Sequence, residues 1–340
     1  MKNLVTWLYL CSMVMTTTVF AETINAIQAT VSNPMEAMVG TCPDSFTPEE
    51  GDNPDFVSGA VKRRFHLHLP DDLSTPRPVF VSLTGTVQPE LDFTRQSGLD
   101  LLTKDGWIVL TPYRRCSNEG RTCNPYAETR RPVTTMDGRT WEPWYESTHY
   151  PTDNEGPDVT FIREAVQCAA SGWPVARDAV YVGGISAGGS MSNRIMTYNS
   201  DFFAGAIPAS GNWGPGRVPK SPRPMEKSIV LIMWGGATDI WPLENPIANY
   251  APDTKYAGEF FAAQDQVVTV SCTGPHGHAW PANNYFRPPF SSADLNVQNQ
   301  FTLWAASTLL SHPKGSDPAG FTLTTPPPGF SCVVGAYSDH

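Results

Sequence analysis

The stretch Val180-Tyr181-Val182-Gly183-Gly184-Ile185-Ser186-Ala187-Gly188-Gly189-Ser190 decides how this chain is expected to fold. It begins as an apolar strand and continues into a helical pattern that runs from Ala187 to about Tyr198. A G-x-S-x-G pattern lies between the two. Its glycines permit a sharp strand-to-helix turn that exposes a serine hydroxyl at a helix N-terminus, where developing negative charge is favoured. The sequence therefore predicts that Ser186 is a nucleophile.

The flanking sequence alternates between short apolar runs and helical periods. Strands are predicted at Val61–Leu69, Pro78–Leu83, Gly106–Leu110, Ala179–Gly183, Ala204–Ala209, Ile229–Met233 and Val267–Ser271. Helices are predicted at Asp158–Ser171, Ala187–Tyr198, Tyr256–Ala263 and Phe301–Ser311. This alternation predicts an α/β fold with a mostly parallel sheet. Cys116–Pro157 has no clear period and is interpreted as an insertion at the rim of a site, and Pro313–His340 as a loop held by Cys332.

The composition excludes several classes of partner. Acidic residues number 33 and basic residues 23, for a net charge of −10. This balance argues against a nucleic-acid binder, which needs Lys and Arg to neutralise phosphates, and against a polybasic membrane-surface protein. The hydrophobic fraction of 40% is enough to form a sizeable core. We therefore expect a globular protein with no nucleic-acid or membrane partner, and the composition does not indicate its oligomeric state.

Residues 1–21 have the features of a cleaved signal peptide. Lys2 precedes an apolar run from Leu4 to Phe20, and Val19-Phe20-Ala21 places small residues where signal peptidase reads them. The run is short for a membrane anchor and contains several Ser and Thr residues. We expect cleavage after Ala21, an N-terminal segment over 22–40, a catalytic domain over 41–340, and a secreted or periplasmic product.

Export favours disulfide bonds among the remaining cysteines. Loss of Cys11 leaves an even set, and disulfides persist in oxidising compartments. The six are Cys42, Cys116, Cys123, Cys168, Cys272 and Cys332. Cys116 and Cys123 lie close together in a polar stretch and are predicted to form a local bridge.

A nucleophilic serine needs a base and an acid that orients the base. In this type of fold the acid and then the histidine follow the serine, each just after a strand. Asp239 follows the predicted strand that ends at Met233, and His278 follows the one that ends at Ser271. Glu244 is the alternative acid and His276 the alternative base.

The sequence argues against two other classes of function. A metal hydrolase would need a third ligand beside His276 and His278, and the sequence offers no convincing one. A non-catalytic binding protein on the same scaffold would normally lack a member of the Ser–His–Asp set, and all three are present. No metal or cofactor is therefore predicted.

Four segments resemble one known family of enzymes. Arg177–Gly189 contains the serine motif, Phe202–Ala206 follows the nucleophile helix, Gly156–Ile162 opens the upstream helix, and His278-Ala279-Trp280-Pro281 resembles an H-x-W-P histidine motif. Together they are similar to the secreted α/β-hydrolase esterases of the polyhydroxybutyrate depolymerase and feruloyl esterase group. The resemblance covers roughly residues 75–285. It implies a single-domain α/β-hydrolase fold with helices on both faces of the sheet.

Two motifs depart from that family. Leu83-Thr84-Gly85-Thr86-Val87-Gln88 stands where members carry L-H-G-C-x-Q. Because backbone N–H groups stabilise the oxyanion, the resemblance still implies an oxyanion hole formed by Thr86 and Ala187. Asp239-Ile240-Trp241-Pro242 places a tryptophan where a smaller residue is common, and is similar to oxidised polyvinyl alcohol hydrolases, relatives that cleave β-diketones with the same triad.

The expected activity is the hydrolysis of short-chain esters, hydroxyalkanoate oligomers or other polyesters through an acyl-enzyme. Trp280, Trp241 and Trp234 lie close to the triad motifs and are predicted substrate contacts. The alternative is carbon–carbon cleavage of a β-diketone in oxidised polyvinyl alcohol. Because His278 must be neutral to act as a base, activity should fall below about pH 6–7.

Overall fold

The computed structural model describes residues 35–43, 46–86, 88–114, 141, 156–214, 224–241, 248–281 and 292–337. Met35–His340 forms one compact unit. The predicted signal peptide, the Cys116–Cys123 bridge, most of the predicted insertion and the alternative acid Glu244 lie outside the described residues. None of the helices in the described ranges is both long and apolar enough to cross a membrane.

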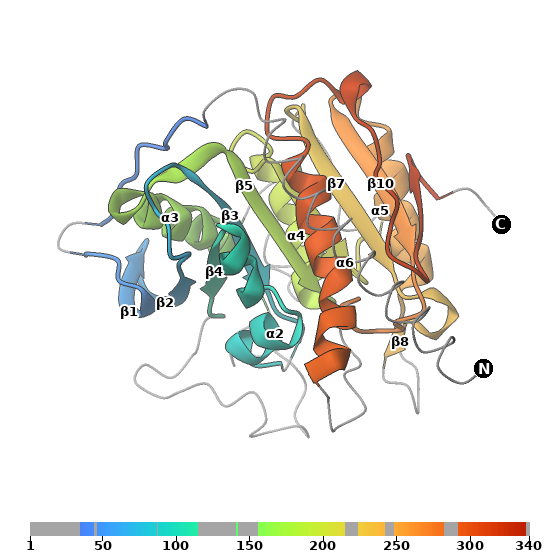
Figure 1. Cartoon of the computed structure of the whole chain (residues 1–340), viewed down its shortest axis with the longest axis horizontal. Helices are drawn as coiled ribbons and strands as arrows, with labels where there is room; N and C mark the ends of the chain where they lie inside the picture. Colours follow the sequence, from blue (N-terminus) through green and yellow to red (C-terminus); the bar gives the residue numbers. More distant parts are fainter. Residues whose placement is uncertain are drawn as a thin grey trace, which may run out of the picture. The chain divides into compact units, whose positions relative to one another are not determined.

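A nine-stranded sheet forms the centre of this unit, in the order β1-β2-β4-β3-β5-β6-β7-β10-β11 (Figure 1). The strands β4, β3, β5, β6, β7 and β10 are parallel to their neighbours in this order. Their bounds are β4 Ile108–Pro112, β3 Arg77–Leu83, β5 Val175–Ile185, β6 Gly205–Ala209, β7 Ser228–Trp234 and β10 Val267–Thr273. These parallel pairings confirm the predicted α/β fold with a mostly parallel sheet. The strands are apolar on both faces, so helices can cover the sheet on both sides.

Helices cover the two faces of the sheet. The cluster on one face joins sheet residues such as Val79 and Val81 to α3 (Pro157–Gly172), α4 (Ala187–Asn199) and α5 (Ala251–Ala262). The cluster on the other face joins Phe80 to α2 (Glu90–Gln96), the 3₁₀ helix Asp100–Asp105 and α6 (Ser292–Leu310). Figure 1 shows α2 and α6 in front of the sheet and α3 and α4 behind it. Alternate residues of one strand thus supply both cores.

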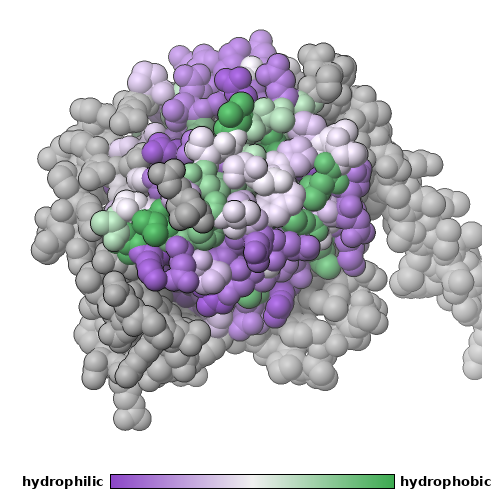
Figure 2. Space-filling view, turned by 90° about the vertical axis from the view of Figure 1, so that its left-hand side faces the viewer, coloured by the Kyte–Doolittle hydropathy of each residue, from purple (hydrophilic) through white to green (hydrophobic). Residues whose placement is uncertain are grey.

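Antiparallel strands border the parallel sheet at both edges. β1 (Gly51–Ser58) pairs with β2 (Val61–His68), which pairs antiparallel with β4, and β11 (Ser331–Val334) pairs antiparallel with β10. The sequence predicted β2 but not β1 or β11. β1 carries Asp52, Asn53, Pro54 and Asp55, residues that are depleted in strands, and tertiary pairing overrides that preference. Figure 2 views the side of the molecule at which β1 and β2 lie in Figure 1, and shows apolar residues scattered among hydrophilic ones.

Two helices begin earlier than their apolar periods indicated. α5 begins at Ala251 rather than near Tyr256, and α6 begins at Ser292 rather than Phe301. Pro252 lies in the first turn of α5, where the missing N–H of proline costs no helical bond. The sequence pattern thus missed the N-terminal turns of both helices.

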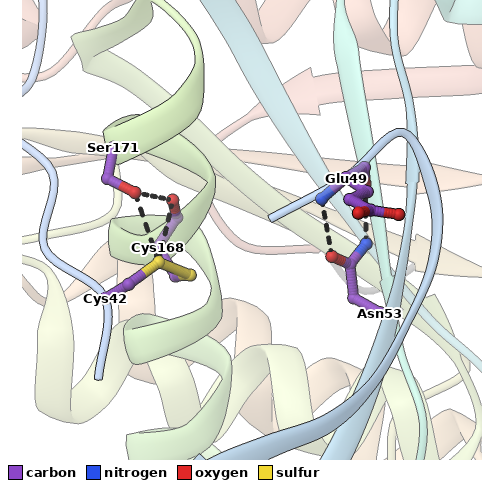
Figure 3. Close-up of a disulfide and its surroundings, with 5 residues drawn as sticks. All are labelled: Cys42, Glu49, Asn53, Cys168 and Ser171. Carbon is purple, nitrogen blue, oxygen red and sulfur yellow. Dashed lines mark hydrogen bonds between the residues drawn. A yellow bond between two sulfur atoms is a disulfide. The ribbon is translucent and has the colours of Figure 1, made fainter. Parts of the chain in front are cut away.

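Disulfide bonds tie peripheral segments to the sheet and helices. Cys42, which precedes β1, is bonded to Cys168 in α3, and the Ser171 hydroxyl donates to the Cys168 carbonyl at 2.7 Å (Figure 3). In the same view, Asn53 exchanges two hydrogen bonds with the backbone of Glu49 and fixes the entry into β1. A second disulfide joins Cys272 in β10 to Cys332 in β11. The predicted use of cysteines in disulfides, and of Cys332 to hold the C-terminal segment, is confirmed.

Loss of the Cys42–Cys168 bridge should destabilise the protein without changing its chemistry. The bridge closes a loop with a sequence separation of 126. We expect the double variant Cys42→Ser/Cys168→Ser to unfold with about 2–5 kcal/mol less free energy than wild type, because the unfolded chain gains conformational freedom. Urea unfolding and kcat on the same preparations test this. A fall in kcat at a temperature where the variant is fully folded would contradict it.

Candidate active site

Ser186 lies in a strained turn between β5 and α4. Its φ is 57° and its ψ −116°, a conformation that residues other than glycine rarely adopt. The turn fits because its flanking glycines have no side chains: a Cβ at Gly184 or at Gly188 would lie 2.1 Å from the Leu83 carbonyl oxygen. The Ser186 N–H donates to the Ala209 carbonyl of β6 at 2.9 Å. The sequence therefore predicted correctly where the strand–turn–helix unit lies.

Asp239 and His278 come together at the ends of neighbouring parallel strands. Asp239 follows β7 through the 3₁₀ turn Gly236–Thr238, and His278 lies in the loop after β10. The His278 Nδ1 lies 2.8 Å from the Asp239 Oδ1. Asp239 is 1% exposed. The other carboxylate oxygen, Oδ2, accepts hydrogen bonds from the Ser210 hydroxyl at 2.7 Å and the Gly235 N–H at 3.0 Å.

Tyr250 contacts both the serine and the histidine. Its hydroxyl lies 3.4 Å from the Ser186 Oγ, and its ring stacks on the His278 imidazole with centroids 4.1 Å apart and an interplanar angle of 18°. The Tyr250 N–H also donates to the Asp239 carbonyl at 3.2 Å. Tyr250 follows the two-stranded ribbon of β8 (Ile240–Trp241) and β9 (Ala248–Asn249). Sequence reasoning missed this residue, because it lies in neither a motif nor a strand end of the main sheet.

The loop after β3 contains the predicted oxyanion residue Thr86. Leu83 pairs with Gly184, so this loop runs beside the turn at Ser186. Ala187, the other predicted oxyanion residue, follows Ser186 and is the first residue of α4. Arg114 donates to the Gly85 carbonyl at 3.0 Å and to the Gln88 carbonyl at 2.5 Å. The same guanidinium pairs with Glu90 at 2.8 Å.

Trp141 fixes the start of the same loop. Its indole N–H donates to the Thr84 carbonyl at 2.8 Å, and the side chain is fully buried. Side chains thus hold the carbonyls of this loop, which is not part of a regular ladder.

The three tryptophans predicted as substrate contacts differ in position. Trp241 is 42% exposed and its ring lies 5.8 Å from that of His278. Trp234 is partly buried and packs edge-on against Tyr337. Trp280 is 1% exposed, packs edge-on against Phe93, and donates its indole N–H to Thr302. The interpretation of Trp280 as a substrate contact is therefore corrected, because its ring belongs to the core beneath α2 and α6.

His276, the alternative base, forms no hydrogen bond to Asp239. Its ring stacks on Phe330 with centroids 5.8 Å apart, and among the described residues neither ring nitrogen has a hydrogen-bond partner. Burial lowers the pKa of His276 to about 4. The residues that the structure describes contain no cluster of three His, Cys, Asp or Glu side chains that could hold a metal ion.

Comparison with known proteins gives relatives along most of the chain. It is 33% identical to the oxidized polyvinyl alcohol hydrolase of Sphingopyxis sp. (strain 113P3), over 92% of this chain and 93% of that protein. It is 34% identical to the enzyme of the same name from Pseudomonas sp, over 87% and 86% of the two chains. No protein-family model matches the sequence.

Solved structures give the same result. The crystal structure of native pOPH superposes with a TM-score of 0.73 at 32% identity, covering 88% of this chain and 98% of that one. That of native sOPH gives a TM-score of 0.71 at 31% identity, covering 89% and 99%. The fold is the α/β-hydrolase fold that the sequence predicted.

Replacement of Arg114 should loosen the loop that contains the predicted oxyanion residue Thr86. Lysine keeps the positive charge beside Glu90 but cannot reproduce the planar fork that holds two loop carbonyls. We expect Arg114→Lys to lower kcat by about 10- to 100-fold, less than the roughly 10²–10³ that follows removal of an oxyanion donor itself. Steady-state kinetics on folded protein measures this.

The matched control is Arg63→Lys. Arg63 also forms a buried ion pair, with Asp158, and its guanidinium lies over the Phe161 ring. This control should lower the melting temperature and leave kcat within about twofold, because Arg63 does not contact the loop. Equal losses of kcat in the two variants would contradict the role of Arg114.

The lowered pKa of His276 makes the fold sensitive to acid. The unfolded chain takes up a proton at this residue near pH 6.5, whereas the folded protein does so only near pH 4. Stability is therefore lost as the pH falls from about 6.5 to 4. We expect His276→Gln, which cannot titrate, to lose less stability than wild type between pH 7 and pH 5, as measured by urea unfolding.

His68 provides an independent comparison. Burial also lowers its pKa to about 4, and it lies on β2. His68→Gln should reduce the loss of stability in acid in the same direction. Parallel stability–pH curves for wild type and both variants would refute the assignment.

Proposed function

Because the chain belongs to the family of oxidized polyvinyl alcohol hydrolases, we propose that it hydrolyses β-diketone groups through Ser186, His278 and Asp239. The observation that carries the proposal is the combination of a serine in a strained turn with a buried Asp239–His278 pair 2.8 Å apart. Both lie against Tyr250, which brings the hydroxyl and the imidazole to one place.

The reaction consumes one water and breaks one carbon–carbon bond. His278 takes the Ser186 proton as Oγ attacks a carbonyl carbon, and Asp239 holds the imidazole and stabilises its charged form. The bond from that carbon to the methylene then breaks, and its electron pair leaves as an enolate. The proton on His278 passes to the enolate and gives a methyl ketone. Water, deprotonated by His278, then releases the carboxylic acid and restores Ser186.

The N–H groups of Thr86 and Ala187 stabilise the tetrahedral oxyanion. Ala187 is the first residue of α4, so the helix dipole adds to its hydrogen bond. The Thr86 loop owes its shape to Arg114 and Trp141. Because the backbone supplies these donors, the threonines at positions 84 and 86 are compatible with the role.

Trp241 is the proposed contact for the apolar part of the substrate. It is exposed, lies beside His278, and belongs to the β8–β9 ribbon. A hydrocarbon chain is uncharged, so the net charge of −10 does not oppose its approach. Trp234 contacts Tyr337 in the structure, so we assign it a supporting role.

Carboxylic esters are the second candidate substrates. The attack of Ser186 on a carbonyl is the same for an ester, and only the leaving group differs. The four motifs that resemble polyhydroxybutyrate depolymerases and feruloyl esterases favour this activity. Short-chain esters and hydroxyalkanoate oligomers are the members of this class that the sequence predicted.

We place the mature enzyme outside the cytoplasm. The two disulfides of the described residues suit an oxidising compartment, and the N-terminal sequence carries the features that signal peptidase reads. Mass spectrometry of the secreted or periplasmic fraction tests this, and a mature N-terminus at Glu22 is the expected result.

A substrate panel tests the proposed reaction. Purified mature protein is assayed on a simple aliphatic β-diketone, oxidised polyvinyl alcohol, p-nitrophenyl butyrate, hydroxybutyrate oligomers and a feruloyl ester. We expect the highest kcat/KM on the diketones and measurable turnover of the butyrate ester. Fast ester turnover with negligible diketone cleavage would reject the principal substrate and favour the second.

The variant Ser186→Ala separates catalysis by the triad from every other route. Loss of the nucleophile should lower kcat at least 10³-fold on diketone and ester alike. A serine-directed phosphonate should label wild type and fail to label the variant. A variant that keeps a tenth of wild-type activity would exclude Ser186 as the nucleophile.

A further inference from the structure

Ser210 is a fully buried serine that contacts the acid of the proposed triad. It follows β6 directly, has no solvent exposure, and its hydroxyl donates to the Asp239 Oδ2 at 2.7 Å. Asp239 uses its other oxygen, Oδ1, for His278. Ser210 is therefore one hydrogen bond away from the acid–base pair.

The backbone of Ser210 is strained. Its φ is 46°, in the left-handed region that favours glycine. Three residues of the described part of the chain other than glycine have a positive φ, and Ser186 is another of them. A glycine at position 210 would relieve the strain but would remove the hydroxyl. The strain therefore points to a need for the side chain.

Hydrogen bonds on both sides hold Ser210 between the nucleophile and the acid. The carbonyl of the preceding residue, Ala209, accepts the Ser186 N–H at 2.9 Å. The Ser210 N–H donates to the Met233 carbonyl of β7, the strand that leads to Asp239, also at 2.9 Å. The end of β6 thus bonds to the turn of the serine and to the strand of the acid.

Two donors on Oδ2 determine how the carboxylate is turned. The Ser210 hydroxyl and the Gly235 N–H both donate to this oxygen. Ser210 directly follows β6, and Gly235 directly follows β7. With Oδ2 fixed, rotation about the Cβ–Cγ bond of Asp239 is restricted, and Oδ1 faces the His278 Nδ1. Without the hydroxyl, one donor remains and the carboxylate can turn away from the imidazole.

We propose that Ser210 is a positioning residue of the triad, whose hydroxyl holds Asp239 in the orientation that His278 requires. This inference rests on the proposed function, because it assigns Asp239 to the triad. Ser210 acts through Asp239 and does not contact the substrate. Its contribution is therefore to kcat, while KM is unchanged.

Two substitutions at position 210 separate the hydroxyl from the backbone strain. Ser210→Ala and Ser210→Gly both lose the donor, and only glycine tolerates a φ of 46°. We expect both to lower kcat by about 10- to 100-fold, below the roughly 10⁴-fold effect of a defective triad acid. The glycine variant should nevertheless melt about 2–4 °C above the alanine variant. A purely structural role predicts instead that activity follows the melting temperature.

The matched control is Ser97→Ala. Ser97 is also fully buried, and its hydroxyl donates to the Phe93 carbonyl at 2.7 Å, away from the triad. This control loses an equivalent hydroxyl and should keep its kcat. If Ser210→Gly is folded and has wild-type kcat, the inference is wrong.

A double-mutant cycle links the effect to the acid. In an Asp239→Asn background, Ser210→Ala should cause little further loss of kcat, because the carboxylate that it positions is absent. Full additivity of the two losses would overturn the inference. Activity retained by Ser186→Ala or Asp239→Asn would instead reject the proposed function, so the two failures are distinguishable.

Discussion

Ser186 has φ 57° and ψ −116°, a conformation that costs an L-residue about 1–3 kcal/mol, and three parallel strands hold it there. β5 delivers the serine, β3 lies so close that Gly184 and Gly188 cannot carry side chains, and β6 accepts its N–H. Any larger residue at these glycines would push the turn away from the Leu83 carbonyl. The close approach therefore sets both the exposure of the hydroxyl and its distance from the loop after β3.

The same sheet determines where the acid and base meet. β7 and β10 are parallel, with Met233 opposite Cys272 and Trp234 opposite Thr273, so the two loops leave the sheet at one level. The loops touch directly, since a Cβ at Gly235 would lie 1.9 Å from the Gly277 carbonyl oxygen. Tyr337, from the C-terminal segment, donates its hydroxyl to the Cys272 carbonyl and also reaches the Ile232 carbonyl. One side chain thus links β7 and β10, the two strands that precede Asp239 and His278.

Sequence patterns predicted what depends on local order along the chain. The sequence predicted the six parallel strands from their apolar residues. It also predicted Ser186, Asp239 and His278, which follow three of these strands. Trp280 shows the limit of proximity in sequence: two residues beyond His278, it turns into the core against Phe93. Tyr250 shows the converse, because stacking on His278 depends on how the β8–β9 ribbon folds back. Ser210 had a usable signal, a polar residue at the carboxyl end of a buried strand.

Backbone and side chains have different roles in this site. The backbone places Ser186, the Thr86 loop and the loops that contain Asp239 and His278, and its strain is balanced by bonds between adjacent strands. Side chains then orient single groups: Arg114 and Trp141 hold carbonyls of the Thr86 loop, and Tyr250 stacks on the imidazole of His278. Because a diketone and an ester differ only in the group that leaves the attacked carbonyl, the proposed mechanism applies to both. Discrimination between them must therefore come from residues outside it, and exposed Trp241 on the ribbon is in a position to provide it.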